Sequence, residues 1–190
     1  MTTNIHITGD DAADALLTSD PLALLIGMLL DQQVPMETAF TGPAKLKERI
    51  GGLDAATIAG YDADELEAAF RITPSIHRYP GSMAGRTQAL CAAIVEDWGG
   101  DASALWRTGD PDGAEILKRL KALPGFGEQK AKIFLALLGK QYGVTASGWR
   151  DSAGDYGLEG SYRSVADIVD PGSLVKVREF KKAAKAAAKK

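Results

Sequence analysis

The stretch Leu123-Pro124-Gly125-Phe126-Gly127 separates two segments that repeat apolar residues at helical spacing. The segment before it carries Ile116, Leu117, Leu120 and Leu123; the one after it carries Ala131, Phe134, Leu135 and Leu138, with Gly139 as its predicted stop. Because so few residues allow only a tight turn, the sequence predicts a helix–turn–helix hairpin over residues 113–139.

Each residue of this turn has a predicted role. Pro124 ends the first helix, and Phe126 anchors the turn in the core. Gly125 and Gly127 permit positive φ and leave backbone amides uncovered, so the start of the second helix can bind a phosphate. An ordinary corner between two helices has the same composition, so the hairpin alone leaves both interpretations open.

Two further motifs lie on either side of the hairpin. Leu29-Leu30-Asp31-Gln32-Gln33-Val34 precedes it, and Tyr162-Arg163-Ser164-Val165-Ala166 follows it. Together with the hairpin, these motifs resemble the HhH-GPD superfamily of base-excision DNA glycosylases, in particular its 3-methyladenine DNA glycosylase II branch. The resemblance covers most of residues 21–168.

This resemblance implies an all-α HhH-GPD fold with two helical lobes, a cleft between them and the helix-hairpin-helix. We expect a glycosylase-like domain over residues 1–175 and a basic tail over residues 176–190. The implied function is DNA repair by a monofunctional DNA glycosylase, which hydrolyses the N-glycosidic bond of a damaged base, an alkylated purine, flipped from duplex DNA. The alternative is a non-catalytic module that binds damaged or distorted DNA.

The resemblance also implies the residues that contact DNA. Gln33 would fill the gap left by the flipped base, with Gln32 in a structural role; a polar helix end explains the same pair without DNA. The predicted DNA-binding residues are Gly125, Phe126, Gly127, Gln129, Lys130, Lys132 and Gln33.

Relatives that also cut the DNA backbone carry a lysine where this sequence has Gln129. Lys130 is one residue later, which turns its side chain by about 100° around a helix. We therefore expect no lyase step, and we expect Lys130 and Lys132 to lie beside the bound phosphate or to face solvent. A lyase that uses Lys130 is the weaker alternative.

The catalytic aspartate of the resembled family falls, by its spacing, on residues 147–149, none of which is acidic. The nearest acid is Asp151, which we predict as the catalytic carboxylate, with Asp155 in reserve. Such a carboxylate stabilises the positive charge that develops on the sugar. A helix cap or a solvated acid beside Arg150 explains Asp151 equally well.

The base pocket is predicted to include Trp149, Tyr156 and His77, residue types that stack on bases. Burial in the core is the alternative for the aromatic residues, and a plain loop between helices is the alternative for His77.

Charge is distributed unevenly along the chain. The net charge is −3, but residues 176–190 hold seven Lys or Arg and one Glu, so 15 basic face 24 acidic residues in the remainder. An acidic body repels DNA except where cations cluster, which favours site-directed binding through the hairpin, with contacts from the tail.

The single cysteine, Cys91, excludes an internal disulfide and the four-cysteine iron–sulfur cluster of the endonuclease III branch. We expect no organic cofactor and no catalytic metal. The resemblance implies a structural potassium or sodium ion at the carbonyls of Leu123 and Gly125. The expected partner is duplex DNA. With no membrane span and no signal peptide, we expect a cytoplasmic, nucleoid-associated monomer.

Helical periodicity and capping residues predict further helices. They are expected over residues 10–17, 21–33, 54–60, 62–70, 82–98 and 102–106, with another beginning at Pro35, and no strand is expected.

Overall fold

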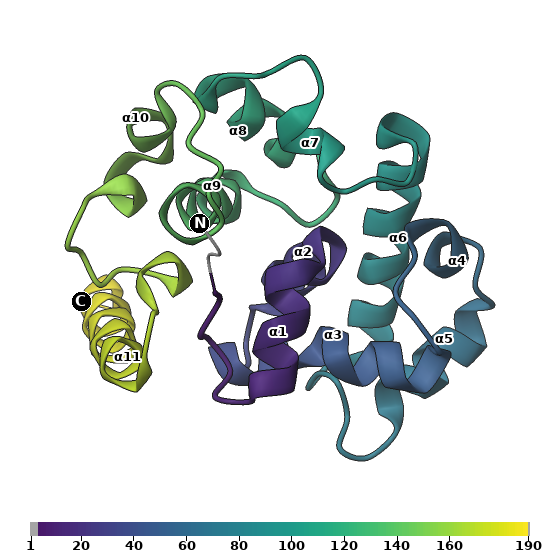
Figure 1. Cartoon of the computed structure of the whole chain (residues 1–190). Helices are drawn as coiled ribbons and strands as arrows, with labels where there is room; N and C mark the ends of the chain where they lie inside the picture. The colour runs from purple at the N-terminus through teal and green to yellow at the C-terminus, as the bar shows by residue number, and fades with distance from the viewer. Residues whose placement is uncertain (1–3, 190) are drawn as a thin grey trace.

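The computed structural model describes residues 4–189, and all regular structure in this range is helical (Figure 1). The first part of the chain forms α1 (Asp11–Ser19), α2 (Pro21–Leu30), α3 (Met36–Ile50), α4 (Ala55–Ala59), α5 (Ala63–Arg71) and α6 (Pro80–Trp98). The second part forms α7 (Ala104–Arg107), α8 (Gly113–Lys121), α9 (Glu128–Gln141), α10 (Trp149–Ala153), the 3-10 turns η1 (Gly154–Gly157) and η2 (Val165–Asp167), and α11 (Pro171–Ala188).

Aspartates set the starts of many of these helices. A carboxylate placed just before a helix accepts hydrogen bonds from amides that have no partner within it. Six helices begin in this way, with the caps Asp10, Asp20, Asp54, Asp62, Asp112 and Asp170. The acidic residues that give the chain its negative charge thus partly serve to define its helices.

Two apolar helices form the centres of the two lobes. Every residue of α2 from Leu22 to Leu30 is buried, and α2 packs on α1, α3 and α6. In the second lobe, α9 is buried from Ile133 to Leu138 and packs on α8, α10 and η2. Figure 1 shows α2 in the middle of the molecule, between α9 on one side and α6 on the other.

The structure corrects three predicted helix boundaries. The second helix ends at Leu30 rather than Gln33, because the backbone leaves the helical conformation at Asp31, whose ψ is 68°, and becomes left-handed at Gln33, whose φ is 61°. The helix predicted from Ser82 starts at Pro80, which suits a first helical position. The second hairpin helix continues past Gly139 to Gln141, and the Trp149 ring packs on Gly139 where a Cβ would otherwise stand.

The predicted boundary between residues 175 and 176 falls inside α11, which is one uninterrupted helix. Val177 is fully buried, and the guanidinium of Arg178 pairs with the carboxylate of Glu37 on α3. Phe180 lies under the guanidinium of Arg163. These contacts attach the first half of the predicted tail to the body.

Within residues 4–189, no single helix is long and apolar enough to cross a membrane. The one pair that has the length and composition together, α1 with α2, is bent by 116°.

Candidate functional site

The hairpin between α8 and α9 has the predicted tight turn. The amide of Phe126 donates to the carbonyl of Leu123 at 3.1 Å, and the buried Phe126 ring meets Phe134 edge to face. Gly125 has φ of 83°, as predicted, but Gly127 has φ of −76°. The prediction of positive φ at Gly127 is therefore wrong, since this residue adopts an extended conformation that other residues also adopt.

The start of α9 presents uncovered amides. Gly127 occupies the capping position without a side chain that could accept from them. Within the described residues 4–189, no acceptor is bonded to the amides of residues 127–130, and residues 127–129 are exposed. Uncovered amides at the positive end of a helix dipole form a binding site for an oxyanion.

The hairpin lies directly against the end of α2. The Leu29 side chain occupies the space beside Gly125 that a Cβ would need. The ammonium of Lys130, in the first turn of α9, donates to the carbonyl of Leu29 at 3.1 Å. The hairpin turn therefore lies beside the end of α2, from which the glutamine loop of residues 31–35 continues.

Within that loop, the two glutamines differ in their surroundings. The Gln32 side chain donates to the Leu29 carbonyl at 3.0 Å and accepts from Arg86 at 3.1 Å. Gln33 is exposed, and its left-handed backbone turns the chain at this point. Gln32 is thus held in place by protein contacts, while the Gln33 side chain is available to a ligand.

His77 supports the glutamine loop from within. Its ring is 1% exposed, and Nδ1 accepts from the amide of Tyr79 at 3.0 Å. This leaves Nε2 as the donor to the carbonyls of Leu30 at 3.1 Å and Gln32 at 2.9 Å. The prediction of His77 in the base pocket is corrected, because both ring nitrogens are engaged and the ring is buried.

Asp31 and Lys130 are two titratable residues at the end of α2 whose burial the sequence did not predict. The Asp31 side chain is 8% exposed, and burial raises the pKa of its carboxyl, an effect that Lys181 and Lys130 oppose. Burial lowers the pKa of Lys130 to about 8, while the charge of Asp31 acts to raise it. The only sequence signal for Asp31 is its position immediately before the two glutamines of the motif.

Lys130 therefore does not follow its predicted placement. Its ammonium lies against the end of α2 rather than at the hairpin amides or in open solvent. Lys132 remains on the outer face, where it pairs with Glu128 at 3.4 Å.

The predicted catalytic acids lie elsewhere. Asp151 on α10 and Asp155 on η1 are both exposed, so neither provides a buried carboxylate. Trp149 is buried between α8 and α9, where Gly113 and Gly139 leave room for it, which corrects its predicted place in a base pocket. The Tyr156 hydroxyl accepts from the side chain of Gln129 at 3.0 Å, so Tyr156 lies beside the first turn of α9.

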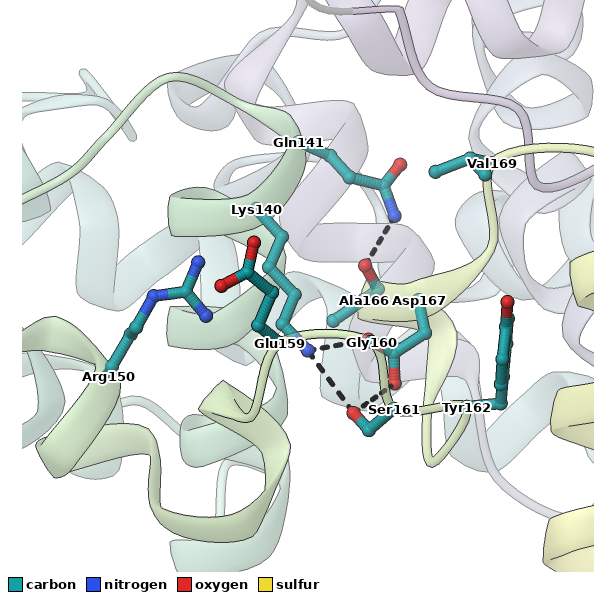
Figure 2. A pocket seen from close by; sticks show the side chains of 10 residues that line it. All are labelled: Lys140, Gln141, Arg150, Glu159, Gly160, Ser161, Tyr162, Ala166, Asp167 and Val169. Atoms are coloured by element: carbon teal, nitrogen blue, oxygen red, sulfur yellow. Dashed lines mark hydrogen bonds and ion pairs between the residues drawn. The ribbon is translucent and has the colours of Figure 1, made fainter.

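The third sequence motif has a structural role. Ser164 and Asp167 cap the turn η2, and Asp167 also pairs with Lys140 at 2.5 Å with both side chains largely buried. The pair lines a cavity of about 280 Å³, and Figure 2 shows the Ser161 hydroxyl beside it, within hydrogen-bond distance of both charges. Lys140 and Asp167 are bonded to each other, and Arg150, which also lines the cavity, donates to the carbonyl of Gly157 at 2.6 Å, so these contacts fix the loop before α11.

The helical lobes and the exposed hairpin define a helix-hairpin-helix protein with the DNA glycosylase fold. The chain belongs to the HhH-GPD superfamily of base excision DNA repair proteins, whose sequence model matches residues 26–172. No curated protein matches the chain by sequence.

Solved structures similar to this chain include two complexes of endonuclease III with DNA. One is a trapped endonuclease III–DNA covalent intermediate in an estranged-adenine complex, with 21% identity and a TM-score of 0.43; the match covers 65% of this chain and 54% of that one. The other is a non-covalent endonuclease III–DNA complex, with 18% identity, a TM-score of 0.47 and coverage of 88% and 73%. The chain thus spans about half the length of the first of these structures.

Proposed function

We propose that this protein is a monofunctional DNA glycosylase that hydrolyses the N-glycosidic bond of a damaged base, an alkylated purine, flipped out of duplex DNA. The observation that carries the proposal is the contact between the hairpin and the end of α2 at Leu29, two residues before the glutamine loop. The uncovered amides at the start of α9 thus lie next to the end of α2, and the loop that follows α2 carries the exposed Gln33.

The chemistry of the two parts is complementary. The amides at the start of α9 suit a backbone phosphate, and phosphate contacts fix the register of a protein on DNA. Extruding a base costs a few kcal/mol, and a side chain that fills the vacated stack offsets part of this cost. Gln33 suits that position, because its amide can donate to and accept from the partner base.

A potassium or sodium ion at the hairpin belongs to the same proposal. The carbonyl oxygens of Leu123 and Gly125 are hard donors of the kind that alkali cations take. Leu123 already accepts from the Phe126 amide, but a carbonyl has a second lone pair. When bound, such an ion would supply positive charge toward the phosphate.

The second candidate function is a non-catalytic module that binds damaged or distorted DNA. It is favoured by the exposure of Asp151 and Asp155, which leaves both predicted catalytic acids in solvent. Under this proposal, the hairpin and Gln33 recognise an unstacked site without chemistry.

Single-turnover incubation with duplexes that carry an alkylated purine, uracil or an abasic site separates the two functions. Base release from the alkylated purine supports the glycosylase. Tight binding to the abasic duplex, with no release from any lesion, supports the binding module. Borohydride trapping of a covalent adduct would contradict the monofunctional assignment.

A further inference from the structure

Asp31 has the surroundings of a reactive carboxylate rather than of a structural one. Its side chain is 8% exposed, and within residues 4–189 it accepts no hydrogen bond. Its closest cation is the Lys181 ammonium at 3.9 Å, on a side chain that is 42% exposed. A contact that long and that open to solvent is weak, so displacing Lys181 from the carboxylate costs little.

The Lys130 side chain also reaches the end of α2, where Asp31 follows the helix. Its ammonium is fixed by the Leu29 carbonyl, two residues before Asp31, and the charges of Asp31 and Lys130 act on each other. Arg86 and Lys181 also face Lys130, while Glu37 faces Asp31 and is itself paired with Arg178. The site thus combines a partly desolvated amine, a buried acid and an excess of positive charge.

We propose that Asp31 and Lys130 are the acid–base pair of the glycosidic cleavage, and that the substrate is a neutral alkylated purine rather than a cationic one. This inference rests on the proposed glycosylase function. It assigns the proton donor and acceptor, which the exposed Asp151 does not provide.

In the proposed reaction, the C1′–N bond breaks and its electron pair goes to the purine, which takes a proton from the Lys130 ammonium. Water forms the new bond to C1′ and gives a proton to the Asp31 carboxylate. The products are the protonated free base and a deoxyribose with a C1′ hydroxyl. Transfer of the proton from Asp31 to the Lys130 amine, through water, restores the pair.

The preference for a neutral base follows from charge and from leaving-group chemistry. A cationic alkylated purine leaves without a proton, so a general acid accelerates only the release of a neutral one. The positive charges of Lys130, Lys181 and Arg86 also oppose the binding of a cationic base.

The test compares single-turnover release of 1,N6-ethenoadenine, which is neutral, with that of 7-methylguanine, which is cationic. We expect Lys130→Met to lose about 100-fold or more on ethenoadenine and less than about 5-fold on 7-methylguanine. Lys130→Arg keeps the charge but gives up no proton, so it should not restore release of ethenoadenine. Asp31→Asn should lose activity on both, and Lys47→Met, on the exposed face of α3, is the matched lysine control.

Equal losses of Lys130→Met on the two bases, or full activity of Lys130→Arg, would reduce Lys130 to a structural or purely electrostatic role. Loss of base release in Asp151→Asn, with full activity in Asp31→Asn, would instead identify Asp151 on α10 as the catalytic carboxylate. Ethenoadenine fluorescence monitors DNA binding by each variant and so identifies one that has failed to fold. A wild-type protein that binds DNA but releases neither base would overturn the glycosylase function itself. Base release by the wild type, with full activity in Lys130→Met and Asp31→Asn, would overturn only the assignment of the acid–base pair.

Discussion

Leu29 and Gly125 come from segments far apart in the chain, and the Leu29 side chain fills the volume that a Cβ on Gly125 would occupy. This contact joins the first lobe to the hairpin. Because Gly125 also has φ of 83°, two independent constraints keep this position a glycine.

Gly125→Ala should therefore lower the free energy of unfolding by about 2 kcal/mol or more, from the left-handed backbone together with the overlap with Leu29. Gly127→Ala is the matched control, since its φ is −76° and nothing lies within 4 Å of the added carbon. Urea denaturation of both variants checks the difference. Similar stability of the two would mean that Leu29 and the turn move apart readily.

Gln33→Gly separates stability from function. Glycine accepts the left-handed backbone at this position, so the free energy of unfolding should stay unchanged or rise by up to about 1 kcal/mol. Base release should fall by about 10-fold or more, because the gap in the stack is no longer filled. Thermal unfolding and single-turnover kinetics on one preparation provide both values. Unchanged release would assign Gln33 to a polar helix end.

Lys130 should make stability dependent on pH in the alkaline range. Its pKa falls from 10.5 to about 8 on folding because the ammonium is desolvated, so between these values the unfolded chain binds more protons. The free energy of unfolding then gains a contribution that rises from pH 8 to pH 10.5. Urea titrations across this range, for the wild type and Lys130→Gln, should show the rise only in the wild type. Parallel curves for the two proteins would contradict the desolvated amine.

The attachment of α11 is tested by two valines on that helix. Val177 is fully buried and Val175 is 51% exposed. Val177→Ala should cost about 1.5–2 kcal/mol, from the loss of two buried methyl groups, whereas Val175→Ala should lie within about 0.5 kcal/mol of the wild type. Chemical denaturation measures both. A detached basic tail would give no effect for either variant.

The sequence alone determined the helical elements and the hairpin. Spacing of apolar residues predicts α8 and α9, and aspartate caps such as Asp20 and Asp112 place the helix starts, because these signals act within one or two turns. The structural role predicted for Gln32 also agrees with its hydrogen bond to Leu29, whereas Gln33 is exposed.

The tertiary structure decided which titratable groups are desolvated together. Asp31 and Lys130 lie far apart in sequence, and neither has a local pattern that marks it as buried. Only the folded chain, in which Lys130 of α9 bonds to the Leu29 carbonyl at the end of α2, removes water from both. Tertiary packing elsewhere in the chain buries Trp149 and His77 and leaves Asp151 in solvent. Local sequence specifies helices through short-range hydrogen bonds and periodicity, whereas burial, and the chemistry that follows from it, is a property of the folded chain as a whole.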